Sequence, residues 1–261
     1  MPELPEVEVF KKYLDATSLN QKIRKVEVQS EKILRNISIE KLKRGLEGRS
    51  LRSTKRRGKY LFANMSDGHW LMFHFGMTGY LKYSRNESDL PYRRVIISFT
   101  NGSKLVYIDQ RQFGQVGLVK DVERYIKGKK LGPDALELDM PTFKNILMKA
   151  KGSLKSAFMN QKLMAGVGNI YADEILFQSG IHPLKKAEQL DRKDMKILFR
   201  KMKKVLQTAI KHWAYYEQFP DSYLIKGRSK KGQCPRCGSS LEQIKVTGRT
   251  TYYCPNCQRK D

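Results

Sequence analysis

The pattern of hydrophobic and polar positions predicts a first half of the chain built from short strands behind a single helix. After Pro5, the apolar residues Val7, Phe10 and Leu14 recur at helical spacing. From residue 23 to about residue 122 the pattern changes to short runs rich in β-branched and aromatic residues, which is typical of strands: 25–29, 59–65, 70–75, 94–100 and 104–109. Asn101-Gly102 joins the last two runs as a tight hairpin. This much strand predicts a β-sandwich or a barrel-like domain.

The second half of the chain has helical periodicity. It begins after 127–134, a stretch whose Gly, Pro and charge are typical of a linker. One predicted helix covers 169–178 and stops at Ser179-Gly180. The clearest one carries apolar residues on a single face, with lysines between them on a solvated face: Met195, Leu198, Met202, Leu206 and Ala209.

The four cysteines form two close pairs near the end of the chain. Two Cys-X-X-Cys turns separated by 16 residues supply the four thiolates of a structural zinc site: Cys234, Cys237, Cys254 and Cys257. Disulfides or a redox pair are the alternatives, and a reducing compartment disfavours disulfides. A zinc ion held by all four thiolates has no open coordination position, so catalysis needs another source. Between the pairs, 244–253 alternates like two strands around Thr247-Gly248, which places Arg249 near a hairpin tip.

The charge of the chain favours a polyanionic partner. The 51 Lys and Arg residues exceed the 26 Asp and Glu residues and give a formal net charge of +25. Phosphate neutralisation makes nucleic acid the leading candidate, ahead of a merely basic soluble protein or a membrane-surface binder. No apolar run is long enough for a membrane span and the acidic start is unlike a signal peptide, so we expect a cytoplasmic, nucleoid-associated protein. The four histidines show no arrangement typical of a zinc protease or a zinc deaminase.

Residues 166–171 superficially resemble a dinucleotide-binding loop. Tyr171 stands at the third glycine position and the surrounding pattern is helical, so we expect no nucleotide cofactor. The glycine turn at Gly166 and Gly168 can present backbone N–H groups to a phosphate at the start of the helix, or can simply be a tight turn.

The second residue is a candidate nucleophile. Methionine before a small residue such as Pro2 is commonly excised, and an α-amino group titrates near ~8, against ~10.4 for lysine. A secondary amine that condenses with an aldehyde carbon gives a cationic iminium, which is an electron sink for elimination. The adjacent Glu3 is a candidate proton donor or acceptor. Alternatively, Pro2 merely starts a helix.

Taken together, these motifs resemble the formamidopyrimidine-DNA glycosylase and endonuclease VIII family. MPELPE, KRRGKYL, FGMTG, DQRQFG, QKLMAGVGNIYADEILF and the closing four-cysteine hairpin occur in the order of the family and span essentially the whole chain. The resemblance implies an α+β fold, with an N-terminal β-sandwich and its N-terminal helix, then a helix-two-turns-helix domain and a zinc-binding β-hairpin. We expect these domains at 1–130, 131–225 and 226–261.

The resemblance also implies roles for individual residues. Pro2 would attack the sugar, Glu3 would protonate the ring oxygen, Lys59 would assist elimination and Arg249 would hold the phosphate. A damaged base must leave the duplex, and the family's wedge maps onto Met77, Arg111 and Phe113, for which core packing is the alternative. Contacts to the backbone of damaged double-stranded DNA, bound by a monomer, map onto Lys151, Lys155 and Asn169.

Indicators of the preferred lesion disagree. MPELPE is typical of the formamidopyrimidine branch, but 213–226 is shorter than the lesion loop of relatives that prefer 8-oxoguanine. The sequence also departs from the family at Gln110, Gln112 and Tyr92. We expect weak 8-oxoguanine excision and a preference for ring-opened purines, oxidised pyrimidines or abasic sites. A non-enzymatic zinc-ribbon protein that binds DNA or RNA, or a ribosome-associated protein, would explain the charge and the cysteines but not Pro2, Glu3 and Lys59.

Overall fold

The computed structural model describes residues 1–86 and 89–258, and the chain divides into two compact units. The first unit comprises Met1–Pro2 and Glu6–Lys130. The second comprises Glu3–Pro5 and Leu131–Asp261, of which 259–261 lie outside the described residues. The first residues of the opening helix therefore group with the second unit.

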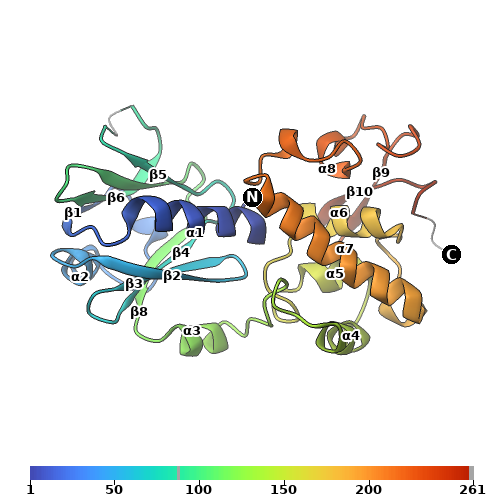
Figure 1. Ribbon diagram of the computed structural model, residues 1–261, viewed down its shortest axis with the longest axis horizontal. Coiled ribbons are helices and arrows are strands. Elements are labelled where there is room, and N and C mark those ends of the chain that lie inside the picture. Colours follow the sequence, from blue (N-terminus) through green and yellow to red (C-terminus); the bar gives the residue numbers. More distant parts are fainter. Residues whose placement is uncertain (87–88, 259–261) are drawn as a thin grey trace. The chain divides into compact units, whose positions relative to one another are not determined.

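The first unit is a β-sandwich of two four-stranded antiparallel sheets with α1 (Leu4–Ser18) running along it (Figure 1). One sheet has the order β1-β6-β7-β5 and the other β2-β3-β4-β8. Residues of both sheets and of α1 share one hydrophobic core, to which Val7, Val95, Leu105, Leu61 and Phe73 belong. The described elements are β1 (Ile23–Val28), α2 (Ile39–Leu46), β2 (Leu51–Arg57), β3 (Tyr60–Met65), β4 (Trp70–His74), β5 (Tyr80–Ser84), β6 (Arg93–Phe99), β7 (Lys104–Ile108), β8 (Gln115–Val119) and α3 (Val122–Gly128).

The predicted helix, the five predicted strands and the Asn101-Gly102 hairpin are confirmed within one or two residues. Three further strands were not predicted: β2, β5 and β8. Each of them lies at the edge of its sheet, where only one neighbour pairs with it. β2 is rich in polar and basic residues and buries only Leu51 fully, so its sequence lacks the apolar run of a central strand.

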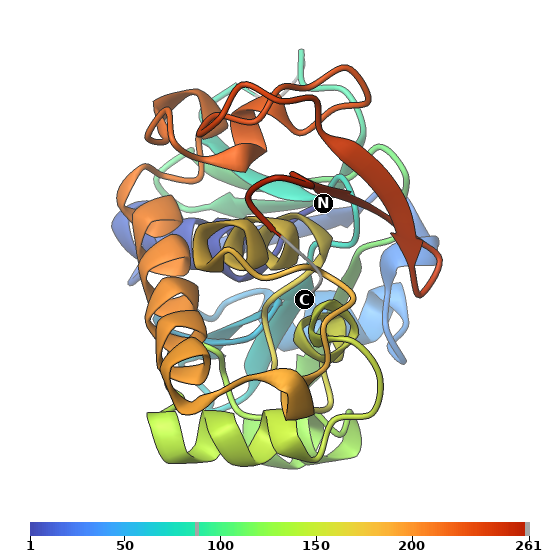
Figure 2. The ribbon, with the colours of Figure 1, turned by 90° about the vertical axis from the view of Figure 1, so that its right-hand side faces the viewer.

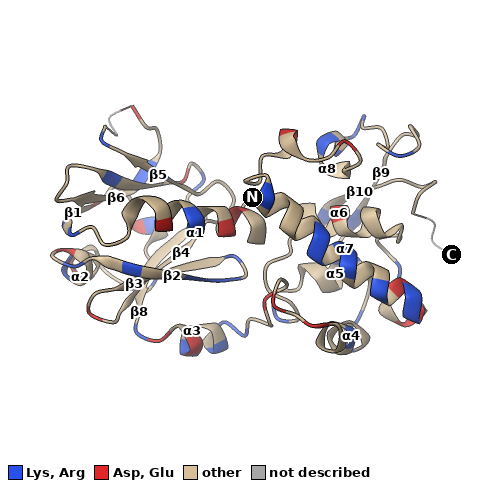
Figure 3. Ribbon diagram, in the orientation of Figure 1, with Lys and Arg blue, Asp and Glu red and all other residues tan. Residues whose placement is uncertain are grey.

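The second unit is mainly helical. Its elements are α4 (Met140–Met148), α5 (Leu154–Met159), α6 (Asn169–Ser179), α7 (Arg192–Lys211), α8 (Leu224–Gly227) and the hairpin of β9 (Glu242–Val246) and β10 (Arg249–Tyr253). Figure 2 shows α6 between α7 and the β9–β10 hairpin. α7 buries the predicted apolar face, including Leu198 and Met202, and Figure 3 shows lysines and arginines along its surface.

Two predicted turns have the expected geometry. α6 ends at Gly180, whose φ of 69° is in the left-handed region that favours glycine at a helix C-terminus. Thr247 and Gly248 have φ values of 47° and 74°, as a two-residue hairpin turn requires, and Arg249 follows this turn directly. Among the described helices, none is both long and apolar enough to cross a bilayer.

Candidate DNA-repair site

Glu3 is fully buried at the N-terminus of α6. Its carboxylate accepts hydrogen bonds from the backbone N–H groups of Gly168 at 2.6 Å, Ile170 at 2.9 Å and Tyr171 at 3.4 Å. The first N–H groups of a helix have no partner within the helix, and the helix dipole favours a negative charge at this end. The second unit therefore fixes both the position and the orientation of the Glu3 carboxylate.

This arrangement bears on the two alternatives for the glycine turn, a phosphate contact or a tight turn. The N–H groups of Gly168, Ile170 and Tyr171 already donate to Glu3, which favours the second alternative. The turn has another purpose, because the N–H of Leu4 donates to the carbonyl of Gly166 at 3.0 Å. A Cβ at Gly166, where φ is 116°, would lie 2.4 Å from the Leu4 side chain, so glycine allows the N-terminal segment to approach closely.

In the first unit, Pro2 is partly buried and Met1 is exposed. Lys59 follows Gly58 in the turn between β2 and β3, where Gly58 has a φ of 55°. Burial, with the nearby Lys59 and Lys129 ammonium groups, lowers the pKa of His74 to about 4. The N–H of Gly76 donates to Nδ1 of His74 at 3.3 Å, so His74 is neutral near pH 7.

The expected wedge is built from two loops of the first unit. Phe113 is 55% exposed, and the guanidinium carbon of Arg111 lies 4.9 Å from the centre of its ring. Met77 is partly buried in the loop between β4 and β5. The exposure of Phe113 contradicts the alternative that it packs in the core, and it leaves an aromatic face available for contact.

A buried carboxylate that the sequence analysis did not assign holds these two loops. Asp109 is fully buried; its Oδ1 accepts from the Thr78 hydroxyl at 2.5 Å and its Oδ2 accepts from the N–H of Gly114 at 2.8 Å. The N–H of Arg111 donates to the same Thr78 hydroxyl at 3.0 Å. Asp109 and Gly114 are the first and last residues of DQRQFG, so this motif was the sequence feature that could have pointed to Asp109. Hydrogen bonds of the buried Asp109 and of Thr78 thus link the two loops that carry the exposed wedge.

Gln112, Tyr92 and Gln110, where the sequence analysis expects departures from the family pattern, have the following surroundings. Gln112 has a φ of 55° and its side-chain oxygen accepts from the Ser30 hydroxyl at 2.5 Å, which ties the wedge loop to the segment after β1. Tyr92 is 49% exposed with a φ of 57°, and Gln110 is exposed.

Lys155 requires a correction. Its side chain is completely buried; its Nζ forms an ion pair with Asp173 at 2.5 Å and donates to the Thr251 hydroxyl at 2.5 Å. Asp173 also pairs with Arg228 at 2.7 Å and accepts from the N–H of Tyr252 at 3.2 Å. Lys155 has no exposed surface to offer to a phosphate. It belongs instead to a buried ionic network, defined here as Lys155, Asp173 and Arg228, that joins α5 and α6 to β10.

Other predicted contact residues lie beside this network. The Asn169 amide nitrogen donates to the carbonyl of Thr250 at 3.0 Å, which also links α6 to β10. Arg249 is exposed after the hairpin turn, and no described residue forms an ion pair with it. Lys151 is exposed and lines a cavity of about 690 Å³ together with Thr247 of the hairpin tip. Lys151 and Arg249 are therefore accessible cations of the second unit.

The four cysteines fit a zinc ion. Their sulfur atoms lie within 4.8 Å of one another, with Cys234 to Cys257 at 3.8 Å and Cys237 to Cys254 at 3.6 Å. Tetrahedral zinc with Zn–S bonds of ~2.3 Å requires sulfur atoms about 3.8 Å apart. None of the four is in a disulfide. This closed set of four thiolates would hold one structural zinc ion and would brace the hairpin that carries Arg249.

The fold and this site define a class: a two-unit protein in which a β-sandwich is followed by a basic helical domain with a four-cysteine zinc finger. Three family models match it, described as the formamidopyrimidine-DNA glycosylase N-terminal domain over 1–116, the H2TH domain of that enzyme over 131–218, and a zinc finger found in FPG and IleRS over 233–259. The chain belongs to the formamidopyrimidine-DNA glycosylase family.

Individual relatives agree over nearly the whole chain. The formamidopyrimidine-DNA glycosylase of Pelotomaculum thermopropionicum is 36% identical over 99% of both chains, and that of Streptococcus pneumoniae is 34% identical over 100% of both. Among solved structures, Lactococcus lactis Fpg in complex with DNA containing an abasic site has a TM-score of 0.87 and 32% identity, and covers 99% of this chain and 100% of its own. The same enzyme with DNA containing N7-benzyl-Fapy-dG has a TM-score of 0.86, 32% identity and the same coverage.

Proposed function

We propose that this protein is a bifunctional DNA glycosylase and abasic-site lyase of base-excision repair. The observation that carries the proposal is the anchored carboxylate of Glu3, which three backbone N–H groups of the α6 N-terminus hold directly after Pro2. The names of the relatives and the DNA in the solved Lactococcus lactis complexes support damaged double-stranded DNA as the partner.

In the proposed reaction, the Pro2 nitrogen, freed by removal of Met1, attacks C1′ of the deoxyribose. The bond from C1′ to the damaged base breaks, and the base leaves with the bonding electrons and the proton that the Pro2 amine loses. Glu3 delivers a proton to the ring oxygen, and the sugar opens to an iminium. Loss of a C2′ proton then breaks the C3′–O3′ bond, and loss of a C4′ proton breaks the C5′–O5′ bond. We assign assistance in these eliminations to Lys59 and phosphate binding to Arg249.

Eversion of the base needs a residue to fill the gap in the duplex. We assign this to Phe113 with Arg111 and Met77. The ring of Phe113 is exposed, the buried Asp109 holds its loop, and filling the gap offsets the few kcal/mol that unstacking costs. Lys151 and Asn169 are the proposed contacts to the DNA backbone, and Lys155 is proposed to position β10 without touching DNA.

For the lesion, we propose ring-opened purines, oxidised pyrimidines and abasic sites over 8-oxoguanine. The shortness of the segment 213–226, within which Trp213 and Tyr215 are 50% and 61% exposed, supports this preference. Single-turnover excision on duplexes that differ only in the lesion tests this preference. Excision of 8-oxoguanine as fast as that of a ring-opened purine would contradict it.

Trapping with borohydride on abasic-site DNA tests the lyase. The wild-type enzyme should give a reduced covalent adduct that Pro2→Gly loses, while Pro5→Gly, a matched change three residues further on, retains it. A protein that binds the DNA without any adduct would instead be the zinc-ribbon binding module. Intact mass of the protein from its native host should show that Met1 has been removed.

A further inference from the structure

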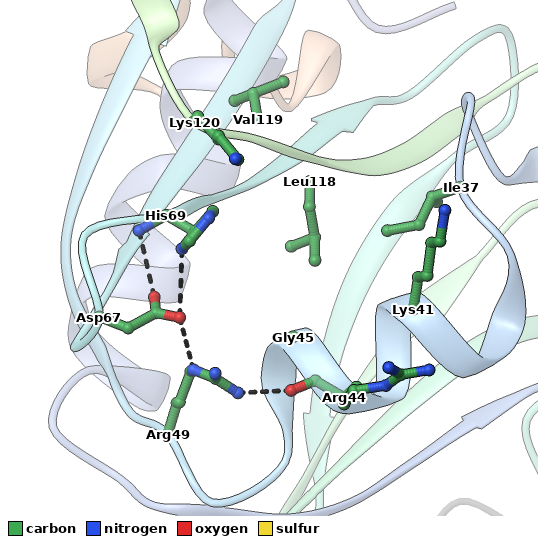
Figure 4. Close-up of a pocket in the computed structure, with 10 residues that line it drawn as sticks. All are labelled: Ile37, Lys41, Arg44, Gly45, Arg49, Asp67, His69, Leu118, Val119 and Lys120. Carbon is green, nitrogen blue, oxygen red and sulfur yellow. Dashed lines mark hydrogen bonds and ion pairs between the residues drawn. The ribbon is translucent and has the colours of Figure 1, made fainter.

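A cavity of about 360 Å³ opens in the first unit, and none of the residues assigned to the DNA-repair site lines it. Figure 4 shows its walls: the α2 helix with the segment before it, the turn between β3 and β4, and the end of β8. Its volume is within the usual range of about 300–1,000 Å³ for small-molecule sites.

Cations surround this cavity. Arg49 is already used, because its guanidinium pairs with Asp67 at 2.5 Å. Lys41, Arg44 and Lys120 are exposed, and no described acidic side chain forms an ion pair with any of them. The carboxylate among the lining residues, that of Asp67, already pairs with Arg49. The three remaining positive head groups therefore favour an anionic occupant.

The apolar wall of the cavity suits a flat, largely apolar ring. Ile37, Leu118 and Val119 line it and are only partly buried, so an occupant would remove their apolar surface from water. The imidazole of His69 lies between Asp67 and the cavity, with its Nδ1 3.2 Å from the Asp67 carboxylate (Figure 4). The side chain of His69 is 41% exposed, so its ring is available for stacking.

A glycine shapes this wall. Gly45 lies within the α2 helix, where glycine costs about 1 kcal/mol relative to alanine. A Cβ at this position would lie 2.2 Å from Cδ1 of Leu118, which points toward Gly45 in Figure 4. Gly45 thus provides the space that Leu118 occupies, and an alanine there would displace Leu118 without any change of charge.

We propose that this cavity is a second binding site, separate from the DNA-repair site, for a phosphate ester on a planar ring, that is, a nucleotide. Lys41 and Lys120 extend from opposite sides of the cavity (Figure 4), and one of them binds the phosphate while His69 and Leu118 contact the ring. The nucleotide is either a free mononucleotide or the 5′-phosphorylated end of a DNA strand, because the two present the same chemistry.

Calorimetry on the full-length, zinc-loaded protein tests the site with three probes: adenosine monophosphate, inorganic phosphate and adenosine. The monophosphate should bind at least about tenfold more tightly than either part alone, because only the monophosphate uses both the cations and the apolar wall. Equal affinity for the monophosphate and inorganic phosphate, or no binding of the monophosphate at millimolar concentration, would overturn the proposal.

Variants test the contributions of the cations and of the apolar wall separately. The double variant Lys41→Gln with Lys120→Gln should weaken monophosphate binding at least about tenfold. The control, Lys144→Gln with Lys196→Gln, removes the same charge from a different cavity in the second unit and should leave binding unchanged. Gly45→Ala should weaken monophosphate binding but not phosphate binding. Equal weakening by the control pair, or no effect of either test variant, would contradict the site.

Competition then assigns the source of the nucleotide. If a DNA end is the occupant, a 5′-phosphorylated dinucleotide should displace the monophosphate and the 5′-hydroxyl dinucleotide should not. If only mononucleotides displace it, the occupant is a free nucleotide. Displacement by both dinucleotides equally would show that the phosphate is not recognised and would overturn the proposal. Borohydride trapping reports on the lyase independently.

Discussion

The wedge of the first unit and the ionic network of the second unit differ in whether their side chains are exposed to solvent or buried. In the wedge, Phe113 and Arg111 are exposed, and the buried Asp109 supports them through backbone and hydroxyl contacts. In the network, Lys155 and Asp173 are themselves buried, and what they hold is β10. Exposed groups are available to a ligand, whereas buried ones act through position. A basic residue in a DNA-binding domain is therefore not necessarily a DNA contact.

The largest effect is expected at Glu3, where a buried group is assigned to the chemistry. Glu3→Gln should lower single-turnover base excision by about 10²–10⁴-fold, because the proton to the ring oxygen is lost while the amide oxygen can still accept N–H groups of α6. Glu123→Gln, which removes an exposed carboxylate, is the control and should have normal activity. Normal excision by Glu3→Gln would show that Glu3 only anchors the chain.

Asp173→Asn tests the network. It leaves Lys155 and Arg228 without a counter-charge in a buried setting, so the free energy of unfolding should fall by about 3–5 kcal/mol. Glu27→Gln, which breaks the exposed ion pair with Lys25, should change it by less than about 1 kcal/mol. Urea unfolding of both variants measures the difference, and similar small losses would mean that the network contributes little.

His74 in the first unit and Glu174 in the second should make contributions to the free energy of unfolding that change with pH in opposite directions. The lowered pKa of His74, about 4, contributes stability that is present above pH ~6.5 and is lost as the pH falls toward 4. Burial raises the pKa of Glu174 in α6 to about 7, and this contribution is present below pH ~4.5 and is lost as the pH rises toward 7. Each amounts to about 3 kcal/mol over its full range.

Removing either His74 or Glu174 should therefore change how the free energy of unfolding varies with pH. Between pH 4.5 and 6.5, His74→Gln should lose stability as the pH rises, and Glu174→Gln should gain it. Urea unfolding across this range, with the wild type between the two variants, checks the signs. Parallel profiles for the two variants would refute the assignment.

The smallest effect is expected at the wedge. Phe113→Ala should slow excision by about tenfold, since one stacking contact is worth ~1–3 kcal/mol, and should change the free energy of unfolding by less than about 0.5 kcal/mol. Met148→Ala removes a side chain of similar exposure from α4 and should change neither the excision rate nor the free energy of unfolding. A large loss of stability in Phe113→Ala would mean that the ring packs against the protein.

Apolar runs identified the central strands β3, β4, β6 and β7 and also the edge strand β1. The other edge strands of the sandwich, β2, β5 and β8, were missed, and β2 shows why: an edge strand needs no apolar run. The four-cysteine cluster follows from spacing alone. The buried state of Lys155 does not, because its partner Asp173 is 18 positions away and only the fold brings them together. Asp109 likewise belongs to the DQRQFG motif, but its role depends on a contact with Thr78 that spacing does not show.

We propose that the amine of Pro2 forms the covalent bond to DNA. Its most direct test is peptide mapping by mass spectrometry of the borohydride-reduced adduct between the full-length enzyme and abasic-site DNA. We expect the N-terminal peptide to begin at Pro2 and to carry the sugar remnant on the Pro2 nitrogen. A remnant on Lys59 or on another lysine, with the Pro2 nitrogen unmodified or still covered by Met1, would contradict it.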